Sequence, residues 1–406
     1  MNRKVILYVK AFSDFGTFMD TIVLNVLIYA ATGSTGWMAA AMAFRTAGGV
    51  FSSIFSGILA DRFDRRKIMI ISDLARGILI LSLISFPSPY MIILVSFAIG
   101  FSNSSFMVSF NAEIPQIFGE NKVLETNALI SRLTSASLVA GFLAAGILTD
   151  IIGYHITLII DSATYFLSAA VLMMLKWESA PGRKAGVQST LQGKLSSIFS
   201  DIKEVYAYLK LAPMLMLVNL VFLAGSFAGS SHNLGIPILA EALNPDRQSF
   251  YYGLIWSTWG IGSILSAFLL PRLRWARGSR IYLACFISAI LMSSGFIIFL
   301  SSSYIPAILL VAFLTGIFDA AFTTLHATIL QKSANHIRGR IFGVGMLLKS
   351  LGFACGFILA PAVLDSTSLT VLAASFHGIL IVMTLLIMVR TYIFARTKNQ
   401  QEAGSA

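Results

Sequence analysis

Apolar runs of about twenty residues recur along the whole chain, and each is long enough to cross the hydrocarbon core of a bilayer as a helix. Hydrophobic residues make up 57% of the 406 residues and charged residues only 12%, which leaves too little polar surface to cover a soluble globule. Membrane β-barrels are built from shorter, alternating stretches. The sequence therefore predicts an all-α polytopic membrane protein.

The apolar runs predict twelve transmembrane helices. They lie near residues 4–30, 37–60, 68–86, 90–111, 124–149, 153–176, 211–241, 250–271, 280–301, 304–331, 339–364 and 369–392. A polar connector follows the sixth run, and apolar residues recur in it every three or four positions, which indicates an amphipathic helix. We expect an N-terminal six-helix bundle (1–176), a cytoplasmic linker (177–210), a C-terminal six-helix bundle (211–392) and a cytoplasmic tail (393–406).

Basic residues are distributed unevenly between the two sides of this topology. If both termini are cytoplasmic, all but four of the 29 Lys and Arg residues fall in or beside cytoplasmic segments. The exceptions are Arg45, Arg76 and Lys349, inside spans, and Arg247, in an outside loop. The positive-inside rule therefore predicts a multi-pass protein of the cell inner (plasma) membrane with cytoplasmic termini. The net charge of +11 is explained by topology, so we expect the lipid bilayer and no nucleic acid as a partner.

The two predicted halves are related in sequence. At an offset of 215 residues, identical residues pair across the halves: Ala112, Ile114 and Gln116 match Ala327, Ile329 and Gln331, and Gly141, Phe142, Ala145 and Asp150 match Gly356, Phe357, Ala360 and Asp365. Parallel halves of this kind place a substrate site between them, near the middle of the membrane.

A short charged loop joins the second and third predicted helices. Its residues Asp61 to Lys67 carry six charges in seven positions. From Gly57 onward the loop resembles the hallmark loop of the major facilitator superfamily, except that Asp64 stands where the family has Gly. The resemblance implies the major facilitator fold, with a loop that latches the halves together in one conformational state. Candidate latch residues are Gly57, Asp61, Arg62, Arg65, Arg66, Asp73 and Arg76.

A simple topological anchor is the alternative interpretation of this loop, and it accounts for the basic residues but not for Gly57 and Asp61. Three further segments resemble the macrolide-efflux and enterobactin-exporter branch of the superfamily: Thr32-Gly33-Ser34, Asp161 to Phe166, and Arg338 to Ile341. This branch implies export of drug-like or siderophore-like molecules.

Polar side chains recur every three or four residues along one face of the first, fourth, seventh and tenth predicted helices. In the major facilitator fold these four helices line the central cavity. The candidate cavity residues are Thr17, Thr21, Asn25, Ser102, Ser105, Ser109, Asn219, Ser226, Ser230, Asn233 and Thr323. A single serine or threonine more often bonds the backbone of its own helix, whereas four aligned stripes favour a path for a polar substrate.

Ionisable residues inside the spans are candidates for proton coupling, because such groups are costly in a bilayer and are usually functional. Asp319 and His326 share a face of the tenth helix, and both side chain types can exchange protons there. The alternatives are a structural ion pair for Asp319 and a hydrogen-bonded packing role for His326. Asp319 is the first candidate.

Three more groups of ionisable residues lie inside the spans. Asp14 and Asp20 point about 120° apart on the first helix, so only one of them can face the cavity. Asp20 lies roughly 12 to 15 Å from the outer end of its helix, the same depth as Arg45, and we expect an ion pair that is either functional or structural. Asp73 and Arg76 should form a local pair near the charged loop. Lys349 either reaches the cavity or extends toward the cytoplasmic surface.

Together these features predict a secondary active transporter that exports an amphipathic organic molecule by alternating access, driven by protons, with sodium as the other possible ion. The chain carries no phosphate-binding loop for ATP, no His-x-x-x-His pair and no Gly-x-Ser-x-Gly, so we expect neither a cofactor, a metal nor enzymatic activity. An uptake symporter for a small nutrient is the alternative within transport, and a passive channel or membrane enzyme lies outside it. We expect a monomer and a cationic or neutral small-molecule substrate.

Overall fold

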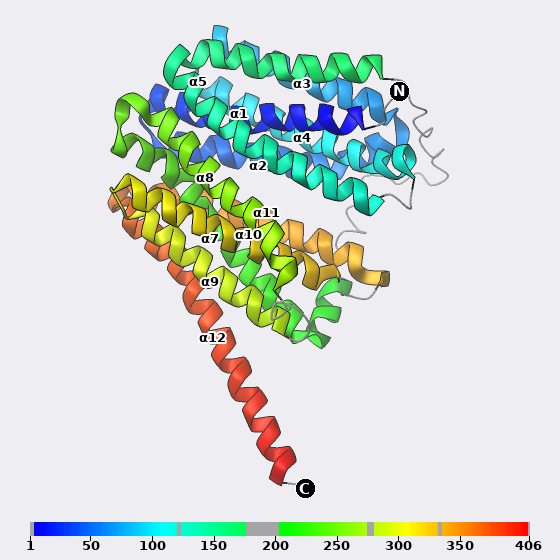
Figure 1. The fold of residues 1–406 in the computed structure, drawn as a ribbon, viewed down its shortest axis with the longest axis vertical. Helices are drawn as coiled ribbons and strands as arrows, with labels where there is room; N and C mark the ends of the chain where they lie inside the picture. Colours follow the sequence, from blue (N-terminus) through cyan, green and yellow to red (C-terminus); the bar gives the residue numbers. More distant parts are fainter. Residues whose placement is uncertain (1–3, 120–122, 176–202, 274–279, 332–334, 405–406) are drawn as a thin grey trace. The chain divides into compact units, whose positions relative to one another are not determined.

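The computed structural model describes the chain except for residues 1–3, 120–122, 176–202, 274–279, 332–334 and 405–406 (Figure 1). The helices are α1 (Val5–Thr32), α2 (Thr35–Arg62), α3 (Arg65–Ser85), α4 (Pro89–Phe118), α5 (Val123–Met174), α7 (Pro213–Leu243), α8 (Gln248–Leu269), α9 (Ile281–Leu300), α10 (Ile305–Gln331), α11 (Asn335–Ser366) and α12 (Leu369–Gly404). Two 3-10 turns, η2 (Pro245–Arg247) and η3 (Leu270–Arg272), flank α8. The described residues include no strand.

The long helix α5 contains two of the predicted spans. Gly153 interrupts it with φ 79° and ψ 166°, a backbone conformation that favours glycine, so α5 is two helices joined at this residue. Ten helices in the described part of the chain are long and apolar enough to cross a membrane, and α5 counts once among them. The prediction of an all-α polytopic membrane protein is confirmed.

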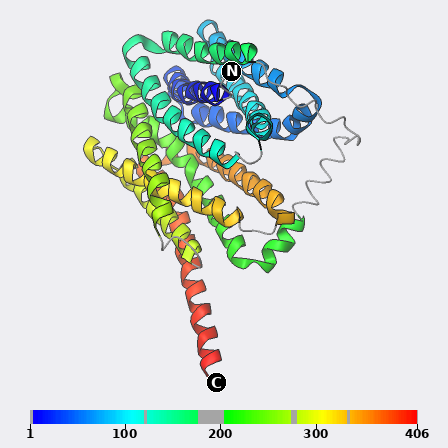
Figure 2. The same cartoon turned by 45° about the vertical axis from the view of Figure 1, so that its right-hand side comes forward.

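Contacts divide the chain into two compact units. Unit 1 comprises Met1–Gln188 and Leu234–Gly260, and unit 2 comprises Ser189–Asn233 and Ile261–Ala406. Within unit 1, α1 packs against α5, α2 against α4, and α3 against both α4 and α5 (Figure 2). Within unit 2, α9 packs against α10 and α12. Leu234–Gly260, which the sequence places in the C-terminal bundle, groups with unit 1 in these contacts.

Matching glycines bring helices together in both units. A Cβ atom added to Gly141 of α5 would lie 2.8 Å from the carbonyl oxygen of Phe15 on α1. One added to Gly356 of α11 would lie 2.6 Å from the carbonyl oxygen of Phe227 on α7. Only glycine allows backbones to approach so closely. Because these two glycines are paired in the sequence repeat, the same helix crossing recurs in each half.

The predicted linker helix lies mostly outside the described residues. Its last stretch, 203–210, is helical, and Val205 and Leu209 are buried there at the predicted spacing. At the other end of the chain, α12 continues to Gly404, so most of the segment predicted as a tail prolongs this helix.

Candidate functional site

A group of seven ionisable side chains lies in the interior of unit 1, and we call it the charge network. They are Lys10, Asp14, Asp20, Arg45, Asp73, Arg76 and Asp161. All lie in the membrane-spanning helices α1, α2, α3 and α5, and all are buried except Arg45, whose side chain is 23% exposed. Groups of this kind are expensive inside a bilayer and usually mark an ion or substrate pathway, so the network is the candidate site.

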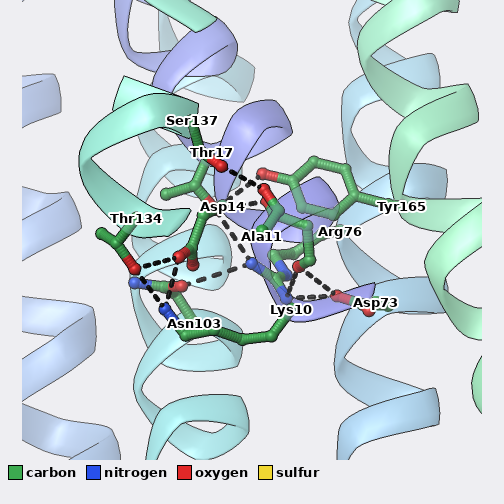
Figure 3. Close-up of polar contacts among 11 residues, drawn as sticks. Lys10, Ala11, Asp14, Thr17, Asp73, Arg76, Asn103, Thr134, Ser137 and Tyr165 are labelled. Carbon is green, nitrogen blue, oxygen red and sulfur yellow. Dashed lines mark hydrogen bonds and ion pairs between the residues drawn. The ribbon is translucent and has the colours of Figure 1, made fainter. Parts of the chain in front are cut away.

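The first ion pair of the network joins Lys10 and Asp14, one turn apart on α1. Thr134 of α5 connects to both: Lys10 Nζ donates to its hydroxyl at 3.0 Å, and that hydroxyl donates to Asp14 Oδ2 at 2.9 Å (Figure 3). Sequence reasoning took Lys10 for a residue of the cytoplasmic helix end and did not name it as a site residue. Its i, i+4 spacing from Asp14 was the available signal.

Arg76 of α3 is the most connected member of the network. Its guanidinium donates to the carboxylate of Asp73, to Ser13 Oγ at 3.0 Å, to Thr17 Oγ1 at 3.1 Å and to Asn103 Oδ1 at 3.2 Å (Figure 3). The planar, five-donor guanidinium suits this role, because a lysine ammonium has only three donors around one point. Arg76 thus ties together α1, α3 and α4.

Asp73, the acid that pairs with Arg76, has further partners. Asp73 accepts hydrogen bonds from Ser13 Oγ at 3.0 Å and from Ser168 Oγ at 2.5 Å, and the Arg76 guanidinium lies 4.5 Å from the ring centre of Tyr165. The expected Asp73–Arg76 pair forms. Beyond this local contact, the pair has partners on three other helices of unit 1, α1, α4 and α5.

The ion pair expected between Asp20 and Arg45 is also confirmed, with 2.6 Å between Asp20 Oδ1 and Arg45 Nη1. The other oxygen, Asp20 Oδ2, accepts from the hydroxyl of Tyr165 at 2.8 Å. That hydroxyl also lies 3.2 Å from Thr17 Oγ1, while Arg45 Nη2 donates to the carbonyl oxygen of Thr17 at 3.3 Å. The pair therefore links α1 to α2 and to the second half of α5.

Asp161, in the second half of α5, differs from the other acids. Its side chain is fully buried, and neither carboxyl oxygen has a hydrogen-bond partner among the described residues. It interacts electrostatically with Asp20, Arg45 and Arg76. Sequence reasoning used Asp161 only for its resemblance to a family branch, although an acid inside a predicted span was itself the signal.

The charged loop is described in part. Asp64 accepts from the backbone N–H groups of Arg66 and Lys67 at 2.9 and 3.4 Å, so the acid that replaces the family's Gly caps α3. Arg65 lies 3.5 Å from the buried carboxylate of Glu113, and Arg66 donates to the carbonyl oxygen of Leu172 at 2.9 Å. The side chains of Asp61 and Arg62 and the surroundings of Gly57 lie outside the described part of the structure.

The proton candidates of unit 2 lie on α10. Asp319 is half-buried, and Thr323, which is exposed, donates to its backbone carbonyl at 3.0 Å. His326 is buried and stacks on Phe222, with 3.8 Å between ring centres. Its Nε2 atom has no hydrogen-bond partner among the described residues. Lys349 of α11 is exposed.

Unit 2 also contains two buried histidines that sequence reasoning considered only as metal ligands or passed over. His232 Nδ1 of α7 lies 3.3 Å from His377 Nε2 of α12, and His377 Nδ1 lies 3.2 Å from Ser293 Oγ of α9. The ring of His232 also stacks on Phe296 at 3.7 Å. These contacts hold three helices of unit 2 together.

Many side chains of the polar stripes bond to the backbone of their own helix. The donors are Thr17, Thr21, Asn219, Ser226, Ser230 and Asn233. Ser105 instead contacts Ser52 at 2.8 Å, and Asn25 donates to the hydroxyl of Tyr252 at 3.0 Å. Ser102 and Ser109 are buried, and Ser109 Oγ has no partner among the described residues. A hydrogen bond to the backbone of the same helix is the ordinary role of a single serine or threonine hydroxyl, and several of these side chains have it.

The chain is similar in sequence to known membrane transporters. Residues 7–291 and 218–405 match the family described as Major Facilitator Superfamily. The chain is 29% identical over 322 residues to an uncharacterized MFS-type transporter of Bacillus subtilis (strain 168), YfiS, covering 75% of this chain and 73% of that one. It is 25% identical over 371 residues to a putative bacilysin exporter of Bacillus amyloliquefaciens, BacE, covering 88% of each.

Solved structures show the same fold. The nucleoside transporter NupG superimposes with a TM-score of 0.75 over 96% of this chain and 99% of its own, at 16% sequence identity. At that identity the likeness supports the fold and carries no information about the substrate.

Proposed function

The chain belongs to the Major Facilitator Superfamily and is a secondary transporter, and on that premise we propose that it exports an amphipathic organic molecule in exchange for protons. Both termini would face the cytoplasm, as the distribution of Lys and Arg favours. The substrate would be drug-like or siderophore-like, and cationic or neutral. The putative bacilysin exporter among the relatives supports the outward direction.

The charge network is the observation that carries the proton part of this proposal. It places seven ionisable side chains in the spans of unit 1, and four of these seven are carboxyls that can bind a proton. A purely structural bundle gains little from such groups, because well-packed apolar residues in their place are often as stable or more stable. Their presence is explained if one or more of them changes protonation during the transport cycle.

Unit 2 would supply further polar groups for proton coupling and substrate binding. We propose that Asp319, half-buried on α10, is a second coupling residue and that His326 supports it. The polar side chains of α1, α4, α7 and α10 would face the substrate when their backbone bonds are exchanged for bonds to it. The loop from Gly57 to Arg66 would act as the latch.

The test is a flux measurement on inside-out membrane vesicles that contain the protein and hold an acidic interior. Macrolides, cationic dyes and siderophores are added one class at a time, and the internal pH is followed with a fluorescent dye. If the proposal holds, one class dissipates the gradient and accumulates inside the vesicles. Vesicles without the protein, and protein-containing vesicles in which an ionophore has removed the gradient, are the controls.

Other outcomes point elsewhere. If accumulation follows an imposed sodium gradient and does not respond to the proton gradient, the coupling ion is sodium and not the proton. Substrate loss from preloaded vesicles under the same acidic interior would indicate uptake by symport in the cell. Flux that does not saturate with substrate concentration would indicate a channel.

A further inference from the structure

We propose that Asp20 and Asp161 form a proton-binding pair, in which one proton and the single guanidinium of Arg45 are shared between two carboxyls. The inference deepens the proposed function, and its role in transport rests on that function. The binding of the proton itself does not, because it follows from the charges and contacts inside unit 1.

The charge network has one more acid than it has bases. Lys10 pairs with Asp14 and Arg76 with Asp73, so each of these bases already has an acid. Arg45 pairs with Asp20, and Asp161 is then the fourth acid among three bases. If all seven groups were ionised, one negative charge would stay uncompensated in an apolar interior, which is very costly. One bound proton makes the charge network neutral.

The Asp161 carboxyl accepts no hydrogen bond from the described residues. A buried carboxylate normally accepts several hydrogen bonds, as Asp73 does from Ser13, Ser168 and Arg76. Both oxygens of Asp161 are fully buried and lack a hydrogen-bond partner among the described residues. The neutral, protonated carboxyl is the form that such surroundings tolerate.

Asp161 packs against the same part of α1 that carries Asp20. Asp161 and Tyr165 are one turn apart on the second half of α5, and Gly16 and Asp20 are one turn apart on α1. Tyr165 donates to Asp20, while a Cβ atom added to Gly16 would lie 3.1 Å from Asp161 Oδ1. The missing side chain at Gly16 gives the Asp161 carboxyl its place against α1, on the helix face that also carries Asp20.

Arg45 is suited to exchange between the two acids. It is the most exposed member of the network, and it interacts electrostatically with Asp161 as well as with Asp20. When its guanidinium moves from Asp20 to Asp161, the Asp161 O–H bond breaks and the proton passes to the Asp20 carboxylate. Asp20 then holds the proton, and the network stays neutral throughout.

The experiment is infrared spectroscopy of the full-length protein in liposomes at neutral pH, with no substrate and no gradient. The C=O stretching band of a protonated carboxyl is measured in protein labelled with carbon-13 at aspartate. We expect the wild type to show one such band. Asp161→Asn and Asp20→Asn should each abolish it, because three acids then face three bases. Arg45→Gln should roughly double it, because two acids then lack a base.

The controls separate charge matching from misfolding. Asp150→Asn removes an acid whose partner is the half-exposed Arg247, outside the network, and should leave the band unchanged. Asp161→Glu keeps a carboxyl and should shift the band without loss of intensity, which guards against a general loss of structure. Absence of the band in the wild type, its survival in either Asn variant, or no gain in Arg45→Gln would overturn the proposal.

The transport assay then separates this inference from the proposed function. In Asp161→Asn, accumulation driven by the proton gradient should be lost, and its ratio to the substrate exchange measured in the same vesicles should fall. A wild type that shows the band but transports without protons would leave the proton-binding pair intact and refute proton-driven export. Gradient-driven accumulation at the wild-type rate in Asp161→Asn would refute the pair's role in coupling.

Discussion

Removing Arg76 should destabilise unit 1 far more than removing a surface arginine. Arg76→Met keeps an unbranched apolar side chain but removes the guanidinium and its bonds to Asp73, Ser13, Thr17 and Asn103. Breaking a buried ion pair by removing one partner costs about 3–5 kcal/mol, because the other charge is left uncompensated. Asp73 keeps the two serine hydroxyls as donors, so we expect about 4 kcal/mol, a roughly thousandfold drop in the ratio of folded to unfolded protein.

The assay is equilibrium unfolding of the purified protein in mixed detergent micelles, followed by circular dichroism. Arg247→Met is the matched control: its ion pair with Asp150 spans 3.1 Å, but the arginine is 50% exposed, so the loss should be about 0–1 kcal/mol. Asp73→Asn alone should also be destabilising. The double variant Arg76→Met with Asp73→Asn should be at least about 2 kcal/mol more stable than the sum of the single losses predicts.

Two results would refute this reasoning. If Arg76→Met costs no more than Arg247→Met, the buried contacts of Arg76 do not stabilise the bundle. If the losses of Arg76→Met and Asp73→Asn simply add, the two side chains are not energetically coupled, and the charge count that assigns Arg76 to Asp73 would fail with them.

Three further predictions concern single positions. Gly16→Ala places a methyl group against Thr164 and Asp161, so it should cost about 1–3 kcal/mol in the same unfolding assay, whereas Gly378→Ala, where nothing lies within 4 Å, should be nearly neutral. Equal effects of the two would contradict the close packing of α1 on α5. Asp319→Asn should abolish proton-driven accumulation and preserve substrate exchange in vesicles; full gradient-driven activity would remove it from the coupling path. Asp61→Asn should slow turnover several-fold with little change in substrate affinity, and unchanged turnover would leave the charged loop as a topological anchor only.

Helix type and position could be predicted from sequence, because the length and composition of each apolar run are local properties. The twelve predicted spans correspond to the helices of the structure, with α5 counted as two across Gly153. The Asp20–Arg45 pair could also be predicted, since depth in the membrane follows from counting residues along two adjacent helices. The equivalence of Gly141 and Gly356 could be recognised from the sequence repeat alone.

The partners inside the bundle could not be found in this way. Lys10 lies near a helix end and counted as a topology signal, yet its side chain turns inward to Asp14 and Thr134. The three-residue spacing of Asp73 and Arg76 predicted a local pair. The orientation of α3 about its axis also directs these side chains toward α1 and α4. Periodicity gives the face of a helix and not the neighbour that the face meets.

By itself, then, the sequence determined that this chain spans a membrane with two related sets of helices. The length of the apolar runs, the distribution of basic residues and the internal repeat can all be read along the chain without knowledge of its folding. Only the tertiary structure decided which carboxyl faces which base. It left Asp161 buried against Gly16 with three bases already matched to three other acids. Charge compensation in an apolar interior acts over a few ångströms in space, so it is set by the packing of distant segments.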